Sequence, residues 1–160
     1  RQRNPDFGYS ISATTRSVRK GEIDGRDYFY LDEKKFKEKI NAGAFIEWAE
    51  VHGYLYGTLW EGINKQLNAG KKILLDIDVQ GGMKIKEKLK DSILIFILPP
   101  SVKELERRLK NRRTDSNTEI QKRLKIAELE IECAEKYDYQ VINHHFDKTV
   151  SAIEAIIKRT

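Results

Sequence analysis

Two arginines stand three residues apart in a polar loop near the start of the chain. Arg16 and Arg19 belong to the run S-A-T-T-R-S-V-R at residues 12–19, which follows strand-like alternation at 9–13. Two guanidinium groups can hold one phosphate from two sides, and the end of a strand would fix their direction. The alternative is a pair of ordinary exposed loop arginines.

A glutamate interrupts an apolar segment further along the chain. Glu47 lies within the predicted strand 45–49, where a carboxylate must either reach solvent or find a partner. Guanine presents two neighbouring donors, N1–H and N2–H₂, that a carboxylate can accept. Tyr28 and Tyr56, in short predicted strands, offer hydroxyls to a ligand. The alternatives are an outward-facing glutamate and tyrosines of the core or the sheet surface.

Two aspartates close the apolar run 72–78. Asp76 and Asp78 would lie at the carboxyl end of a buried parallel strand, where α/β folds bind ligands. In phosphate-transferring enzymes such an acid commonly holds Mg²⁺, directly or through water. A buried acid without a partner is costly, so the position favours a function.

A second group of arginines surrounds the polar loop 114–117. The group comprises Arg108, Arg112, Arg113 and Arg123. Arginines beside a short loop between two helices resemble a lid that closes over phosphates, whose charge needs such cations. The alternative is a solvated basic helix end.

The elements that must position these residues can be predicted from periodicity and capping. Asp32 caps a helix that carries Phe36 and ends near residue 43, and short strands with tight turns fill residues 11 to about 60. Capping boxes at 101–104 and 116–119 begin two further helices, and Asp147 is predicted to cap the last one. The runs 72–78 and 93–98 read as strands of a parallel sheet covered on both faces. This order predicts an α/β domain with a separate mixed β lobe.

Composition narrows the class of protein. The chain has 160 residues, of which 39% are hydrophobic and 34% charged, and its net charge is +5. No run approaches the ~18 apolar residues of a membrane helix, and the polar residues 1–5 predict no signal peptide. Cys133 is the only cysteine, which excludes an internal disulfide and favours the cytoplasm. The three histidines lack companions for zinc, and no nucleic-acid-binding motif is visible, so neither a nucleic acid nor a membrane is expected as a partner.

Taken together, these strings resemble the guanylate kinase family almost from end to end. The resemblance rests on their order and spacing: S-A-T-T-R-S-V-R, G-E-I-D-G-R-D-Y, F-I-E-W-A-E, Y-L-Y-G-T, L-L-D-I-D-V-Q-G, L-P-P-S, R-R-L-K-N-R-R and V-I-N. It implies a single domain over 1–160 with a P-loop-type parallel sheet between helices. A small mixed β lobe at 11–61 would bind GMP, a helical lid would lie at 103–127, and 62–102 with 128–160 would form the core.

The resemblance also implies roles for individual residues. The guanine base would be contacted by Ser12, Glu47 and Thr58. The GMP phosphate would be held by Arg16, Arg19, Tyr28 and Tyr56. Asp76 and Asp78 would share the guanine side and the Mg²⁺ side, with the metal reaching Asp76 through water. The ATP phosphates would be reached by Arg108, Arg112 and Arg123, and Asn143 would lie near the adenine.

The chain departs from the family pattern at its beginning. The family opens with a strand and a G-x-x-x-x-G-K-[ST] loop that cradles the donor phosphates, and these 160 residues contain neither. The resemblance therefore predicts an Mg²⁺-dependent transfer from ATP to GMP, with this chain by itself able to bind GMP but inactive in transfer. The competing hypothesis is a non-catalytic guanylate-kinase-like scaffold module that binds phosphorylated peptides through the same arginines and tyrosines.

Overall fold

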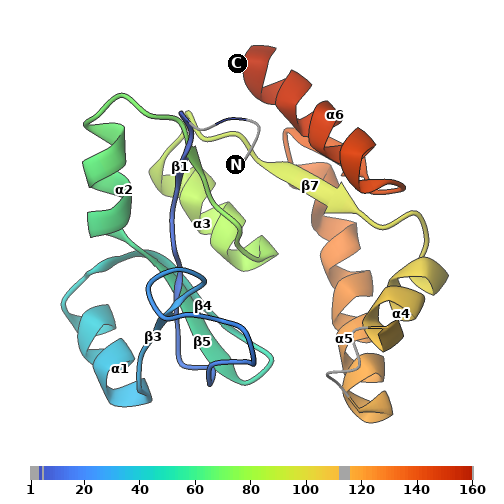
Figure 1. Cartoon of the computed structure of the whole chain (residues 1–160), viewed down its shortest axis with the longest axis horizontal. Helices are drawn as coiled ribbons and strands as arrows, with labels where there is room; N and C mark the ends of the chain where they lie inside the picture. The colour runs from blue at the N-terminus through green and yellow to red at the C-terminus, as the bar shows by residue number, and fades with distance from the viewer. Residues whose placement is uncertain (1–3, 5, 112–115, 160) are drawn as a thin grey trace. The chain divides into compact units, whose positions relative to one another are not determined.

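A computed structural model describes residues 4, 6–111 and 116–159, and its helices and strands confirm the α/β class (Figure 1). The chain divides into two compact units, Arg1–Lys90 and Asp91–Thr160. Among the described residues, no helix has both the length and the apolar character needed to cross a membrane.

The first unit contains a mixed four-stranded sheet. Its elements are β1 (Gly8–Tyr9), β2 (Ala13–Thr14), β3 (Phe29–Tyr30), α1 (Glu33–Asn41), β4 (Phe45–Val51), β5 (Tyr54–Leu59), α2 (Trp60–Leu67), β6 (Ile73–Leu74) and α3 (Val79–Lys88). The strand order is β3-β2-β5-β4, with β2 parallel to β3 and β5 antiparallel to both of its neighbours. The expected mixed β lobe is thus present.

Two apolar clusters fix the helices of this unit against the sheet. Phe36 of α1 is fully buried and stacks on Phe45 of β4 at 4.5 Å between ring centroids, beside Ala13 of β2. Ile46 of β4 packs with residues of α2 and α3, so β4 carries core side chains in both directions. Asp32 caps α1 as predicted, through its side chain and the Lys35 amide. Figure 1 shows α1 beside β3 and β4.

The run 72–78 differs from its prediction. Only Ile73–Leu74 form a strand, paired in parallel with Gly8–Tyr9, and both residues of this strand are half-buried. The run leaves the strand after Leu74 and reaches Asp78, which is the N-cap of α3. Because β6 pairs over only two residues with β1, it is less covered than a strand inside a full parallel sheet would be.

The second unit pairs two strands and carries three long helices. Its elements are β7 (Ile95–Leu98), α4 (Val102–Asn111), α5 (Asn117–Glu132), the short 3₁₀ helix η1 (Cys133–Lys136), β8 (Tyr139–Ile142) and α6 (Phe146–Arg159). Strands β7 and β8 are parallel over four residue pairs. Leu109 of α4 packs against Ile120 and Leu124 of α5. Ile97 of β7 is 49% exposed, so the strand is open to solvent at this residue.

The predicted caps of this unit are only partly realised. Ser116 and Glu119 form a complete capping box at α5. At α4 the Ser101 hydroxyl accepts from the Glu104 amide, but the Glu104 carboxylate accepts from Arg107 and Arg108 instead of returning to the cap. The last helix begins at Phe146, which places Asp147 in its first turn and not at its cap.

Candidate functional site

The first candidate centre is built around a buried carboxylate. Glu47 is 5% exposed and lies opposite Thr58 in the β4–β5 ladder, where the register shifts between Phe45 and Glu47. Such an irregularity lets consecutive side chains of one strand be buried, as happens for Ile46 and Glu47. The fully buried Thr58 hydroxyl donates to Glu47 Oε1 at 2.6 Å. The sheet therefore fixes an acceptor group inside the unit.

The start of α3 meets this carboxylate. Asp78 caps the helix by accepting from the Gly81 amide at 2.7 Å. A Cβ on Gly81 would lie 2.8 Å from Glu47 Oε2 and 3.1 Å from Asp78 Oδ1, so glycine is needed for both carboxylates to approach the helix. Burial raises the pKa of Glu47, the Thr58 hydrogen bond opposes this, and the charge of Asp78 adds to it. The structure thus brings together two residues predicted at the base, Glu47 and Thr58, and one of the two aspartates predicted to share the guanine and Mg²⁺ sides, Asp78.

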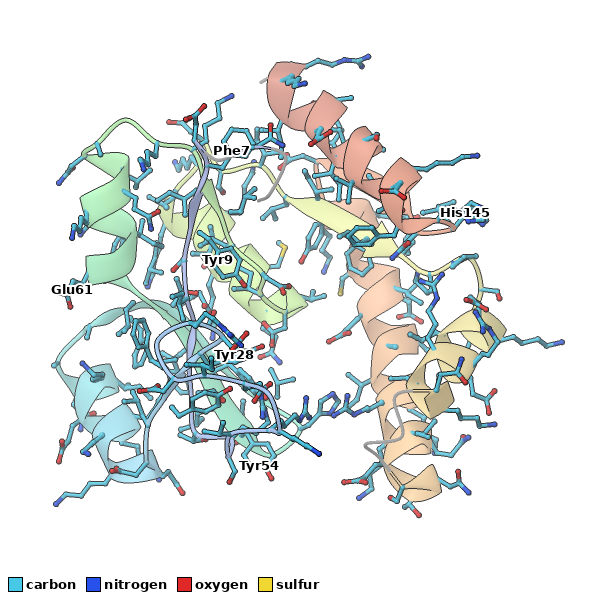
Figure 2. The ribbon with its side chains drawn as sticks, in the orientation of Figure 1. Phe7, Tyr9, Tyr28, Tyr54, Glu61 and His145 are labelled. Carbon is cyan, nitrogen blue, oxygen red and sulfur yellow. The ribbon has the colours of Figure 1, made fainter. Side chains whose placement is uncertain are left out.

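The second candidate centre surrounds a buried arginine. Arg16 is 7% exposed, and its guanidinium lies 5.4 Å from the centroid of the Tyr28 ring. The Tyr28 and Tyr56 rings meet edge to face at 6.0 Å (Tyr28 is labelled in Figure 2). The pKa of Arg16 is raised, chiefly by hydrogen bonding to Glu22 and less by Tyr56. Three residues predicted at the phosphate, Arg16, Tyr28 and Tyr56, therefore form one group.

Three other predicted residues of this unit lie less deeply. Arg19 is exposed, and its described contacts are made by its backbone: the amide donates to the Glu22 carboxylate, and the carbonyl accepts from the Glu22 amide. Asp76 is exposed; its charge contributes to raising the pKa of Tyr28, after the larger effects of burial and Tyr56. Ser12 is half-buried, and its carbonyl accepts from the Phe29 amide. No metal cluster of three or more His, Cys, Asp or Glu occurs among residues 4, 6–111 and 116–159.

In the second unit, two predicted ATP-side residues touch. Arg108 donates from Nε to Glu104 at 2.8 Å and from Nη2 to the Asn143 carbonyl at 2.9 Å. The Asn143 side chain accepts from Thr149 at 3.2 Å. Arg123 is half-buried on α5. Arg112 and Arg113 lie outside the described residues.

The sequence prediction missed three residues that the structure places at these centres. Glu22 binds Arg16, Tyr30 donates to Glu22, and Gly81 makes room for Glu47. A signal existed for Tyr30, since alternation puts it on the same side of its strand as Tyr28. Glu22 gave no such signal, because an acid in a polar loop usually faces solvent.

Comparison with known proteins agrees with this arrangement. A sequence profile described as guanylate kinase matches residues 1–160. The guanylate kinase of Caldanaerobacter subterraneus subsp. tengcongensis is 47% identical over 156 residues, which are 98% of this chain and 76% of that protein. The guanylate kinase of Clostridium perfringens strain 13 is 43% identical and is covered over 72% of its length by 98% of this chain.

A solved structure gives the same result. The crystal structure of guanylate kinase from Anaplasma phagocytophilum matches with a TM-score of 0.84 and 36% identity, over 96% of this chain and 76% of that one. Sequence and fold therefore agree over almost all of the 160 residues, and the chain belongs to the guanylate kinase family.

Proposed function

We propose that this protein transfers the terminal phosphoryl group of ATP to GMP, giving ADP and GDP in purine nucleotide metabolism. The observation that carries the proposal is the buried Glu47 carboxylate, whose hydrogen bonds within the described chain come from Thr58 alone. An ionised carboxylate has about four acceptor sites, so acceptor capacity remains for a ligand. Each relative reported above is called a guanylate kinase, which favours an enzyme over a phosphopeptide-binding scaffold.

Base recognition would follow from hydrogen-bonding chemistry. The guanine edge offers N1–H and N2–H₂ to Glu47, whereas adenine has an acceptor at N1 and no 2-amino group. Asp78 lies beside Glu47 and would add a second acceptor at the start of α3. The hydroxyls of Thr58 and Ser12 can donate or accept, so both fit the remaining polar atoms of the base.

The phosphate of GMP would be bound by the second centre. Arg16 and Arg19 supply the positive charge, and the hydroxyls of Tyr28 and Tyr56 supply neutral donors. Arg19 is the exposed member, so its side chain can reach a ligand, while the buried Arg16 gives the clamp a fixed cation. With the acceptor held in this way, transfer requires alignment and charge stabilisation without a covalent enzyme intermediate.

The donor side would be formed by residues of the second unit. Arg108, Arg123 and Arg112 would contact the ATP phosphates, and Asn143 would lie at the adenine. Mg²⁺ bound with ATP would neutralise charge on the phosphate oxygens. The exposed Asp76 fits such an ion, because Mg²⁺ keeps several waters and needs only one or two carboxylates besides the phosphates. The use of free nucleotides as substrates supports a cytoplasmic location.

The test is a binding measurement, since the 160 residues contain no G-x-x-x-x-G-K-[ST] loop. GMP and AMP are titrated calorimetrically into wild type, Glu47→Gln and the control Glu50→Gln, which changes an exposed glutamate of the same strand. Wild type and the control should prefer GMP strongly. Glu47→Gln places an amide donor against a guanine donor, and we expect it to lose on the order of 100-fold or more in GMP affinity, though less than 10⁴-fold. A Glu47→Gln protein that is folded and keeps the full preference for GMP would refute the proposal.

A further inference from the structure

One carboxylate connects both arginines of the predicted phosphate clamp. Glu22 Oε1 accepts from Arg16 Nη2 at 2.8 Å, and Glu22 Oε2 accepts from Arg16 Nη1 at 3.0 Å. The same Oε2 accepts from the backbone amide of Arg19 at 2.7 Å. The direction of the Arg16 fork and the course of the backbone at Arg19 therefore depend on where this carboxylate lies.

Glu22 itself sits on an irregular loop, in a turn that its backbone amide closes by donating to the Arg19 carbonyl at 3.0 Å. It lies between Gly21 and Gly25, whose φ angles of 91° and 72° are readily adopted only by glycine, and residues 17–21 are exposed. Such a loop gains order from its side-chain contacts more than from a backbone ladder. The turn holds the backbone of Glu22, and the carboxylate at the end of its side chain is positioned by side-chain contacts.

Tyr30 supplies that anchor from the sheet. It belongs to β3, pairs in register with Thr14 of β2, and its backbone amide donates to Asp24 at 2.9 Å. Its hydroxyl donates to Glu22 Oε2 at 2.6 Å, and its ring centroid lies 5.8 Å from the Arg16 guanidinium carbon. The Tyr30 hydroxyl is thus the third donor to Glu22 Oε2. Because Tyr30 belongs to strand β3, this hydrogen bond joins the loop to the sheet.

We propose that Tyr30 is a positioning residue of the phosphate clamp: its hydroxyl holds the Glu22 carboxylate where that carboxylate orients Arg16 and the backbone at Arg19. The inference rests on the proposed GMP-binding function. Glu22 stays ionised and the Tyr30 hydroxyl keeps its proton over a wide pH range. The Arg16 hydrogen bond lowers the pKa of Glu22 to about 2, and burial raises the pKa of Tyr30 to about 12. Supporting contacts that lock the groups touching a ligand are what make a binding site precise.

The test separates the phosphate from the base by using GMP and guanosine. Both are titrated into wild type, Tyr30→Phe and the control Tyr54→Phe, which removes the hydroxyl of a tyrosine that begins β5 and is 44% exposed (Tyr54 is labelled in Figure 2). Phenylalanine keeps the ring beside Arg16, so the fold is retained and thermal unfolding verifies this. We expect Tyr30→Phe to weaken GMP binding about tenfold, as for the loss of a hydrogen bond to a charged group, with guanosine binding unchanged.

A double-mutant cycle shows whether Tyr30 acts through Glu22. In a Glu22→Gln background, Tyr30→Phe should have little further effect on GMP, because the group that it positions has already been altered. Fully additive losses, or equal losses for GMP and guanosine, would overturn the positioning role, as would unchanged GMP binding by Tyr30→Phe. A wild-type protein that binds no GMP would instead refute the proposed function.

Discussion

Two glutamates of the first unit occupy opposite environments. Glu47 is buried beside Thr58 and Asp78, and burial raises its pKa. Glu22 is bound by the Arg16 guanidinium, which lowers its pKa to about 2. The Glu22 carboxylate is paired with a cation and uses its acceptor capacity within the protein, whereas Glu47, whose described side-chain hydrogen bond comes from the Thr58 hydroxyl, keeps capacity for a ligand. This difference supports the proposals that Glu22 is a structural residue and that Glu47 recognises a ligand.

The largest expected effect is on stability and concerns the paired carboxylate. Glu22→Ala leaves the buried Arg16 guanidinium without its counter-ion, and we expect the free energy of unfolding to fall by about 3 kcal/mol. The matched control is Glu33→Ala, which breaks the exposed ion pair with Lys37 and should cost less than about 1 kcal/mol. Urea unfolding measures both. Equal costs for the two variants would mean that Glu22 is an ordinary surface residue.

The stability lost in Glu22→Ala should depend on pH, and this dependence tests whether Arg16 holds the Glu22 carboxylate. The pKa of Glu22 lies below its ordinary value of 4.5, so its contribution is complete above 4.5 and is lost as the pH falls toward about 2. The gap in unfolding free energy between wild type and Glu22→Ala should therefore shrink over this interval. A gap that stays constant from neutral pH down to about pH 3 would show that Glu22 is not held by Arg16 in solution.

A smaller effect is expected at the partner of Glu47. Thr58→Val removes the buried hydroxyl that donates to the carboxylate, which should lower the free energy of unfolding by about 1–2 kcal/mol and weaken guanosine binding. Thr149→Val is the control, since it removes a buried, hydrogen-bonded hydroxyl of the second unit. Calorimetry should show weaker guanosine binding for Thr58→Val and unchanged guanosine binding for Thr149→Val. Equal weakening in both variants would indicate general destabilisation.

Much of the lobe could be predicted from sequence because local rules determine it. The tight turns, the strand predicted at 45–49 and the Asp32 cap depend on a few residues each, and the structure confirms them. The exposure of Ile97 could not be predicted in this way, because an apolar run indicates a strand without saying how many strands cover it. The capping box expected at Ser101 failed at its second half because Glu104 had cationic neighbours one turn away.

The candidate centres were predictable to different extents. The special position of Glu47 could be noticed in the sequence, because a lone acid in an apolar strand must reach solvent or find a polar partner. The Glu22 network was not, since it depends on a loop whose path is set by glycines and on side chains up to eight residues apart. Likewise, the bond from Arg108 to the Asn143 carbonyl joins segments 35 residues apart, which no local pattern indicates.

The most direct test of the central claim is the affinity for guanosine as a function of pH. Guanosine carries no phosphate, whose own titration near pH 6 would obscure the result for GMP. Under the proposal, guanine donors would bind the ionised form of Glu47, and burial raises the pKa of that carboxyl in the free protein. Affinity should therefore increase as the pH rises through this pKa, which lies above the ordinary value of 4.5, and Glu47→Gln should bind guanosine weakly without this dependence. A flat profile for wild type, or the same rise in Glu47→Gln, would contradict the assignment of Glu47 as the group that recognises guanine.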